Sequence, residues 1–396
     1  MTAGLKGAPL FQQIIEATRT AIRTDAATVA LHEPSFCGKE WDYVKECLDT
    51  GWVSSVGKFV DLFEERLAEY TGAKHAISAV NGTVALQVCC RLVGVEAGDE
   101  VLLPALTFIA TANAVHHSGG IPHFVDCDKI TLGIDPEALR VYLKDIAELR
   151  GEGCFNKKTG RRIRALIAVH IYGHPVDLDA LAETCSDFRL ELIEDAAESL
   201  GSKYKGRHTG NHGKVASLSF NGNKIVTTGG GGAILTNDPE LGEQAKHLST
   251  TAKKKHPWKF FHDQIGYNFR LPNLNAALGC AQLEQMDQFV SKKRALAQRY
   301  ESAFRGLAGV KFFKEPSFAQ SNYWLNAFLF DSPDTHQRDA FLEFAHQCGL
   351  MMRPAWILMH RLPMYQSCPR ADLSVSEDLE KRLINLPSSS QLGGDV

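Results

Sequence analysis

The chain has 396 residues, of which 44% are hydrophobic and 22% are charged. These proportions are typical of folded globular proteins, and they exclude a disordered, collagen-like or membrane-embedded chain. The 43 basic and 46 acidic residues give a net charge of −3 at pH 7. Because no global positive field attracts anions, we expect neither a nucleic-acid partner nor a membrane partner.

The cysteines and the N-terminal residues indicate the cellular compartment. The ten cysteines contain no Cys-x-x-Cys pair, so the sequence predicts buried thiols, with neither a disulfide framework nor a metal site. Charged residues interrupt the N-terminal segment, and no apolar run is long enough for a signal sequence or a membrane span. We therefore expect a cytoplasmic protein.

The first predicted elements in chain order are helices. Leu10 to Arg23 spaces its apolar residues as an amphipathic helix does, so we expect residues 1–30 to form an N-terminal helical arm. From Lys58 onward, apolar residues again fall on one helical face, and Thr71-Gly72 ends this second helix.

An alternation of apolar strands with helices follows and defines the fold class. The predicted strands are 75–80, 101–103, 122–125, 165–170, 190–193, 216–220 and 233–236, and the predicted helices between them are 83–93, 110–118, 136–147 and 178–187. Because these strands lack polar alternation, helices must cover both faces of the sheet. The sequence therefore predicts a large α/β domain over residues 31–260, with a mostly parallel sheet of roughly seven strands.

The alternation of strands and helices stops after Thr236. Helical patterns occupy 241–248 and 275–307, and a strand over 326–330 precedes a further helix over 337–348. These elements predict a smaller C-terminal α+β domain over residues 261–396, which begins with an interdomain linker.

The segment Asn81-Gly82-Thr83 lies at a strand end, where α/β sheets bind their ligands. Gly82 permits a close backbone approach, and the first amides of the next helix, with the Thr83 hydroxyl, provide the donors that a phosphate requires. The alternative interpretation is a plain helix N-cap.

Two carboxylates, Asp195 and Glu198, follow the strand that ends at Ile193. Burial of Asp195 requires a cationic partner, which is either the protonated ring nitrogen of a cofactor or a basic side chain in an internal salt bridge. Glu198, three residues further on, is a candidate for a hydrogen bond to the same ligand.

Lys224 follows another predicted strand and precedes the glycine run Gly229 to Gly232. Four consecutive glycines cost conformational entropy, which favours a tight backbone passage beside a ligand. In this context Lys224 is a better candidate for a Schiff-base lysine than for a surface lysine. Ser219, five residues earlier, is a candidate phosphate donor.

Weaker signals come from three further segments. Asn268 and Arg270 are candidate anion contacts in the polar-aromatic segment 266–273, although an interdomain loop explains the same pattern. Lys253 belongs to a short basic run that binds a nucleotide diphosphate or forms a solvated loop. Tyr172 and His174 line the cleft or belong to the structural packing, and Gly173 between them argues against a helical zinc pair.

The ordered motifs resemble those of the DegT/DnrJ/StrS sugar nucleotide aminotransferases, a branch of the fold-type I pyridoxal phosphate enzymes. The resemblance covers about residues 31–386 and rests on five motifs in order: Asn81-Gly82-Thr83, Phe108 in Pro104-Ala-Leu-Thr-Phe, Asp195, Ser219 to Lys224, and Gly266 to Arg270. One departure is Gly229-Gly230-Gly231-Gly232, where many members of the family have Gly-Glu-Gly-Gly.

The resemblance implies a role for each matching residue. Lys224 and Asp195 would be catalytic: Lys224 would form the Schiff base with pyridoxal 5'-phosphate, and Asp195 would pair with the pyridine nitrogen. Phe108 would stack on the ring, and Glu198 would approach its 3-hydroxyl. Asn81, Gly82, Thr83 and Ser219 would hold the phosphate. Asn268 would reach in from a second subunit, which implies a homodimer.

Segments such as Leu31-His-Glu-Pro-Ser-Phe and Arg353-Pro-Ala-Trp356 resemble the LegC-type subgroup. This implies transfer of an amino group from L-glutamate, through pyridoxamine phosphate, to C4 of a UDP-4-keto-6-deoxy-GlcNAc-type sugar for a bacterial surface polysaccharide. The substrate-binding candidates are Tyr172, His174, Lys253, Arg270 and Trp356. The alternatives are amination at C3 and a 4-keto sugar dehydratase, although such dehydratases replace the lysine found here at position 224 with histidine.

Overall fold

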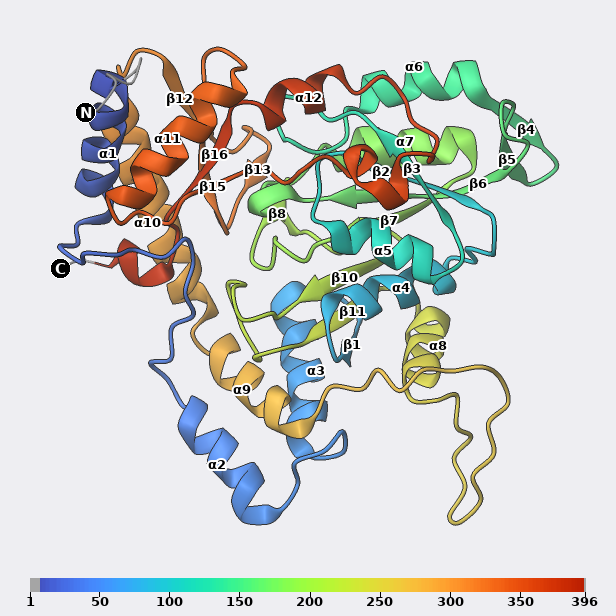
Figure 1. The fold of residues 1–396 in the computed structure, drawn as a ribbon. Helices are drawn as coiled ribbons and strands as arrows, with labels where there is room; N and C mark the ends of the chain where they lie inside the picture. Colours follow the sequence, from blue (N-terminus) through green and yellow to red (C-terminus); the bar gives the residue numbers. More distant parts are fainter. Residues whose placement is uncertain (1–7, 395–396) are drawn as a thin grey trace.

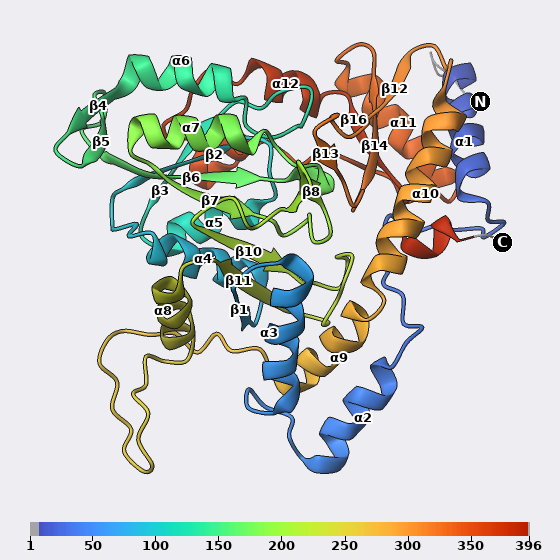
Figure 2. The same cartoon turned by 180° about the vertical axis from the view of Figure 1, so that it is seen from behind.

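The computed structural model describes residues 8–394 and consists of a large layered α/β body with a smaller C-terminal layer beside it (Figure 1). A mixed sheet lies at the centre of the body, and helices cover both of its faces (Figure 2). None of the described helices is long and apolar enough to cross a membrane.

The central sheet has the strand order β1-β11-β10-β7-β6-β2-β3. Strand β11 is antiparallel to both of its neighbours, whereas the other pairs along this path are parallel. The bounds of these strands are β1 His75–Ala79, β2 Glu100–Pro104, β3 Ile121–Val125, β6 Arg162–Val169, β7 Glu191–Asp195, β10 Val215–Ser219 and β11 Gly232–Thr236. The predicted mostly parallel sheet of roughly seven strands is thus confirmed.

Helices follow most of the strands of the central sheet, and four of these helices begin at a polar N-cap residue. The side chains of Asn81, Asp135, Asp177 and Asp238 accept hydrogen bonds from the first turns of α4, α6, α7 and α8. The helices of this body are α2 Glu40–Thr50, α3 Lys58–Thr71, α4 Gly82–Leu92, α5 Ile109–His117, α6 Pro136–Ile146, α7 Leu178–Phe188, α8 Pro239–Ser249 and α9 Asn273–Leu283.

The structure differs from the predicted elements at three places. A hairpin of β4 Ala147–Arg150 and β5 Gly153–Asn156 extends the sheet beyond β6. The helix expected over 275–307 is two helices, α9 and α10 Met286–Phe304, because the chain leaves the helical conformation at Gln285. Helix α2 was not among the predicted elements, and two of its large apolar side chains, Trp41 and Leu48, are exposed.

The C-terminal layer is a four-stranded antiparallel sheet in the order β12-β14-β16-β15. Its elements are β12 Val310–Phe312, β14 Asn326–Phe330, α11 Thr335–Gln347, β15 Arg353–Pro354, α12 Ser374–Glu380 and β16 Leu383–Leu386. A further small sheet joins β13 Ala319–Gln320 to β8 Lys203–Tyr204 and β9 Arg207–His208.

Helix α1, Ala8–Ile22, packs against α10 and α11 of the C-terminal layer. Phe11 is fully buried there, and its ring centroid lies 5.4 Å from that of Phe341. The N-terminal helical arm, which was predicted over residues 1–30, therefore contacts the opposite end of the chain; its residues 1–7 lie outside the described part. The boundaries at residues 30 and 260 stay predictions.

The segment between α8 and α9 projects from the body (Figure 1). We call residues 251–266 the arm, which is distinct from the N-terminal helical arm predicted over residues 1–30. Its two limbs are joined by a bridge between Lys253 and His262. Exposed apolar side chains are concentrated on it: Trp258, Phe260, Phe261 and Ile265.

Candidate active site

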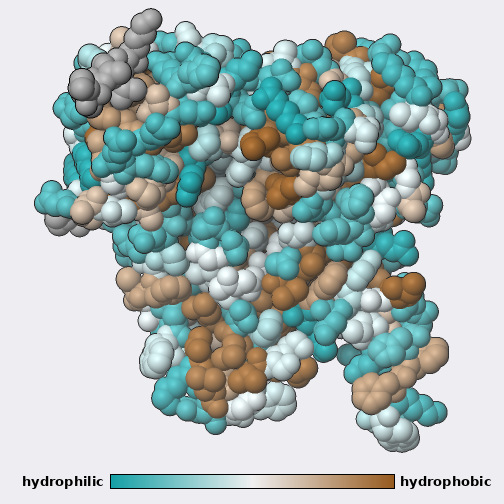
Figure 3. Space-filling view, in the orientation of Figure 1, coloured by the Kyte–Doolittle hydropathy of each residue, from teal (hydrophilic) through white to brown (hydrophobic). Residues whose placement is uncertain are grey.

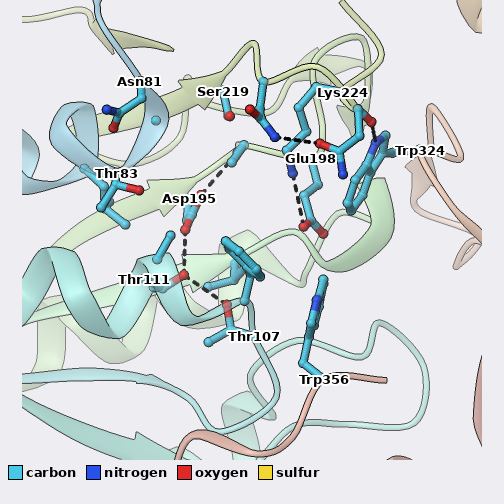
Figure 4. Close-up of a pocket in the computed structure, with 18 residues that line it drawn as sticks. Asn81, Thr83, Thr107, Thr111, Asp195, Glu198, Ser219, Lys224, Trp324 and Trp356 are labelled. Atoms are coloured by element: carbon cyan, nitrogen blue, oxygen red, sulfur yellow. Dashed lines mark hydrogen bonds and ion pairs between the residues drawn. The ribbon is translucent and has the colours of Figure 1, made fainter. Parts of the chain in front are cut away.

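A cavity of about 330 Å³ lies at the carboxyl edge of the central sheet. The chain segments that follow β1, β2, β7 and β10 line it, and Trp324 and Trp356 from the C-terminal part close it (Figure 4). Parallel strands end at one edge of a sheet, so residues from distant positions in the sequence meet there.

The N-terminus of α4 forms one end of the cavity. Asn81 Oδ1 accepts a hydrogen bond from the Val84 amide at 2.9 Å, and the Thr83 and Ser219 side chains line the same end. A methyl group added at Gly82 would lie 2.8 Å from Ser219 Cβ, so this position requires glycine. The N-cap interpretation is therefore correct, and the positive helix end with two hydroxyls also provides an anion site.

The sheet register explains part of the glycine run. Gly232 pairs with Ala79 on one side and with Ser219 on the other. A methyl group at Gly232 would lie 2.5 Å from the Asn81 carbonyl carbon and 2.6 Å from the Gly82 nitrogen. Gly232 thus allows the start of α4 to approach the sheet.

Asp195, at the end of β7, is buried on the floor of the cavity. It accepts hydrogen bonds from the Thr111 hydroxyl at 2.8 Å and the Ala197 amide at 3.2 Å, and Thr111 also contacts the Thr107 hydroxyl. Burial raises the pKa of Asp195 above its ordinary value, and these hydrogen bonds oppose the increase. Within residues 8–394, no basic side chain forms an ion pair with Asp195, so the salt-bridge alternative is not what the structure contains.

Lys224 is directed into the cavity and is not a surface lysine, because its side chain is only 12% exposed. Its Nζ lies 3.3 Å from Glu198 Oε1 and 3.8 Å from the centroid of the Trp324 ring. The indole of Trp324 is itself held by a hydrogen bond to the Asn223 carbonyl at 2.7 Å. The amine is therefore positioned by one carboxylate and one aromatic face.

Glu198 is fixed by the backbone of a strained residue. Its Oε2 accepts a hydrogen bond from the Tyr172 amide at 2.8 Å, and Tyr172 has a φ of 56° in the short 3₁₀ turn Ile171–Gly173. A bulky residue in the left-handed region costs about 1 kcal/mol or more. Burial raises the pKa of Glu198, and the charge of Lys224 opposes this.

The residues present fit pyridoxal phosphate on the chemistry of their donors. The N-terminus of α4 and the two hydroxyls suit the phosphate, and Lys224 suits the aldehyde. The buried Asp195, which has no ion-pair partner among the described residues, suits a cationic ring nitrogen. This fold and this set of groups define a pyridoxal phosphate-dependent transaminase. The model of the DegT/DnrJ/EryC1/StrS aminotransferase family matches residues 36–396, and the chain belongs to this family.

Named relatives agree with this membership. The chain is 36% identical over 367 residues to a GDP-perosamine synthase of Escherichia coli O157:H7, covering 93% of this chain and 95% of the relative. A GDP-perosamine synthase of Vibrio cholerae is 35% identical, with 91% and 94% covered. Among solved structures, Helicobacter pylori PseC, an aminotransferase involved in the biosynthesis of pseudoaminic acid, superposes with a TM-score of 0.82 at 27% identity, covering 91% and 93%.

Most of the predicted site residues lie around this one cavity. The lining includes eight of the predicted cofactor-binding residues and one predicted substrate-binding residue: Asn81, Gly82, Thr83, Phe108, Asp195, Glu198, Ser219, Lys224 and Trp356. Phe108 is 51% exposed at the mouth, where its ring lies 6.2 Å from that of Trp356.

Two predicted substrate-binding residues lie behind the cavity wall. Tyr172 is buried, with its ring 5.0 Å from that of Trp356. His174 is buried between Phe313 and Tyr323, and burial lowers its pKa to about 3. The geometry of His174 corresponds to the packing alternative.

The remaining predicted residues lie outside the cavity of their own chain. Asn268 is exposed beside the base of the arm, where it bridges to Thr250. Arg270 is half-buried, with its Nε atom unpartnered among the described residues. Lys253 is exposed on the arm, with its Nζ 5.1 Å from the Phe260 ring centroid.

Three cavity groups that the structure reveals were not identified from the sequence. Trp324 comes from an irregular segment that carries no motif, and only the tertiary fold brings it to Lys224. Thr107 and Thr111 flank Phe108, and their spacing of four residues across a helix start was the available signal for a pair on one face.

Proposed function

We propose that this transaminase transfers the amino group of L-glutamate to C4 of a nucleotide-linked 4-keto-6-deoxy sugar. The observation that carries the proposal is the convergence of Lys224, Asp195 and the α4 N-terminus on one cavity. Family membership supports a sugar acceptor. The regiochemistry at C4, the LegC-type subgroup and a cytoplasmic location for the reaction remain part of this proposal.

In this proposal the residues have distinct tasks. Asp195, oriented by Thr111, keeps a proton on the ring nitrogen of the bound cofactor. When bound, pyridoxal phosphate supplies an electron sink for the carbon that loses its proton. Lys224 Nζ removes and returns that proton as a general base and acid, and Trp324 shields the amine from water.

Both half-reactions use the same cavity, so we expect ping-pong kinetics. L-Glutamate alone should release one 2-oxoglutarate per active site before any sugar is added. The sugar then accepts the amine, and Lys224 delivers the proton to C4 from its own side of the cavity. The direction of this delivery fixes the configuration of the product.

The nucleotide and the sugar are to be tested directly. The resemblance to the LegC-type subgroup implied a UDP-4-keto-6-deoxy-GlcNAc-type acceptor, whereas two relatives are named GDP-perosamine synthase. A trial with UDP- and GDP-linked 4-keto-6-deoxy sugars separates these acceptors. NMR of the product distinguishes an amine at C4 from an amine at C3 or a dehydrated sugar, and either of the last two results would contradict the proposal.

Asp195→Asn is the test of the chemistry. We expect kcat to fall by at least about a thousandfold because the asparagine cannot hold the ring-nitrogen proton by charge, with the melting temperature close to that of the wild type. Activity against the accepted sugar and 2-oxoglutarate release are the measurements. Turnover within a few fold of the wild type would refute the role of Asp195.

We also propose that two copies form a homodimer and that Asn268 reaches the cavity of the second copy. The arm is apolar at its end, where Trp258 is 76% and Phe260 is 81% exposed. Figure 3 displays a further hydrophobic patch at the lower end of the molecule, where α2, α3 and α9 lie. Exposed apolar surfaces such as these two support a contact with a second copy of the chain.

Light scattering after size-exclusion chromatography tests the dimer. We expect Trp258→Ser combined with Phe260→Ser to give a monomer with reduced activity, because the arm would lose its apolar contacts. Leu149→Ser, which changes an exposed leucine on β4, is the matched control. A fully active wild-type monomer would contradict the proposed dimer.

A further inference from the structure

A second cavity of about 140 Å³ adjoins the first. The two cavities share Asn223, Trp324 and Trp356 as lining residues, so they open beside the same tryptophan walls. The second cavity is further lined by His32, Asn385 and two leucines. Its volume is roughly four to five times that of one water molecule, so it accommodates an edge of a small ring but not a nucleotide.

Two polar side chains in this second cavity have unsatisfied atoms. Both ring nitrogens of His32 are shielded from solvent and have no hydrogen-bond partner within the described chain. The same holds for Asn385 Oδ1, whereas Asn385 Nδ2 donates to the Pro354 carbonyl at 3.4 Å. Buried polar atoms are normally paired, so these three atoms are available to a group that enters the cavity.

The Tyr172 hydroxyl adds a third unsatisfied group near the same place. It is buried without a hydrogen-bond partner among residues 8–394. Burial raises the pKa of Tyr172 and the neighbouring Asn385 side chain lowers it, so the two side chains lie close together. The unsatisfied atoms therefore come from three separate parts of the chain.

The protonation state of His32 determines which ligand group can bind to these atoms. Burial lowers the pKa of His32 well below its ordinary value, and the positive charges of Lys293 and Lys224 add to this effect. A neutral imidazole has one donor and one acceptor, and Asn385 Oδ1 is a second acceptor. A hydroxyl group can accept from the imidazole N–H and donate its one hydrogen to Asn385 Oδ1, whereas a carboxylate has no hydrogen for the asparagine.

We propose that His32 and Asn385 form the subsite that binds a ring hydroxyl of the accepting sugar, an inference that rests on the proposed function. Trp324 and Trp356 provide apolar faces on which the C–H side of a hexose lies. Lys293 is a positioning residue, because its buried amine donates to the carbonyls of Trp324 and Ser388 and holds the tryptophan wall.

His32→Phe tests the subsite when its rates are measured separately for the L-glutamate half-reaction and for the sugar half-reaction. We expect 2-oxoglutarate release from L-glutamate to stay within twofold of the wild type. With the UDP- or GDP-linked 4-keto-6-deoxy sugar that the wild type uses, kcat/KM should fall about tenfold or more, mainly through KM. His117→Phe, the same substitution at an exposed histidine of α5, is the matched control and should change neither half-reaction.

Sugar analogues that each lack one ring hydroxyl identify the recognised group. For one analogue, the kcat/KM of the wild type should be about tenfold lower than for the complete sugar. For that analogue, the kcat/KM of His32→Phe should be no lower than that of the wild type. Asn385→Ala provides a second variant, with the same expected pattern, if His32→Phe does not fold. In a crystal structure with the sugar product, a hydroxyl should occupy the cavity.

Three outcomes would overturn the subsite. They are an unchanged sugar kcat/KM in both variants, an equal loss in the L-glutamate half-reaction, and a sugar complex in which the cavity holds water only. These outcomes differ from failure of the proposed function. In that case the wild type itself would release no 2-oxoglutarate or aminate no nucleotide sugar.

Discussion

At the scale of single residues, β7 ends in two acids with opposite environments. Glu194 and Asp195 are neighbours, so their side chains point to opposite faces of the sheet. Glu194 accepts hydrogen bonds from His170 and from the amides of Gly210, His212 and Gly213. Burial alone would raise the pKa of Glu194, but these bonds and the charge of His170 lower it to about 2.

Glu194→Gln tests this structural role by its pH dependence. Because the pKa in the folded protein lies below the ordinary 4.5, the ionised form stabilises the fold above pH 4.5, by on the order of 3 kcal/mol. This contribution is lost as pH falls from 4.5 toward 2. Urea unfolding at pH 7, 5 and 3.5 should therefore give a difference between wild type and variant that narrows at the lowest pH, and a constant difference would contradict the assignment.

The sequence identified the ionisable site residues because their chemistry is uncommon at strand ends. Asp195, Lys224 and the Asn81-Gly82-Thr83 turn all line the cavity as expected. Trp324 and His32 were not identified as site groups, since an aromatic or a histidine in an irregular segment has many structural uses. Their roles depend on which distant segments meet, and no local spacing encodes that.

At the scale of elements, the parallel strands were predictable because they are largely apolar on both faces. The helices α4, α6 and α7 were predictable because each begins at a polar N-cap residue. The β4–β5 hairpin was not, since most of β4 is exposed and carries polar residues. The antiparallel direction of β11 was likewise unpredicted. The connection over residues 220–231 contains no helix that would carry the chain across the sheet, and it returns the chain beside β10.

Gly232→Ala tests how closely β11 and α4 must approach. The added methyl group would collide with the Asn81 carbonyl carbon and the Gly82 nitrogen, so we expect a loss of about 1–3 kcal/mol in unfolding free energy. The start of α4 would move, and affinity for pyridoxal phosphate should weaken by about tenfold or more. Titration of the cofactor by absorbance and chemical unfolding are the measurements.

Gly222→Ala is the control for this variant, because the nearest atom to its added methyl group is the Gly229 carbonyl oxygen at 4.0 Å. This control should bind the cofactor as the wild type does. Equal behaviour of the two alanine variants would mean that the close approach at Gly232 has no consequence for the anion site.

At the scale of the whole molecule, four buried clusters within residues 8–394 hold the layers together. One of them joins α1 to α10, α11 and the C-terminal sheet. The amphipathic pattern of Leu10 to Arg23 predicted the helix but not its partner, because the partner residues begin almost three hundred positions later. The contact between α1 and these distant helices depends on the tertiary fold and cannot be inferred from the local sequence of either segment.

Phe11→Ala should lower the free energy of unfolding by about 3–5 kcal/mol, since it removes a fully buried ring that packs on Phe341 and Phe344. Gln13→Ala, at an exposed position of the same helix, should change it by less than about 0.5 kcal/mol. Guanidinium unfolding followed by tryptophan fluorescence measures both. A small effect of Phe11→Ala would mean that α1 is not docked in solution.

The docking of α1 also has a consequence during synthesis. The helix leaves the ribosome before its binding surface on α10 and α11 is translated. At elongation speeds of about 5–20 residues per second, this interval is on the order of tens of seconds. During that time the apolar stripe of the nascent chain is uncovered, and it is the segment that a chaperone would bind before release of the finished polypeptide.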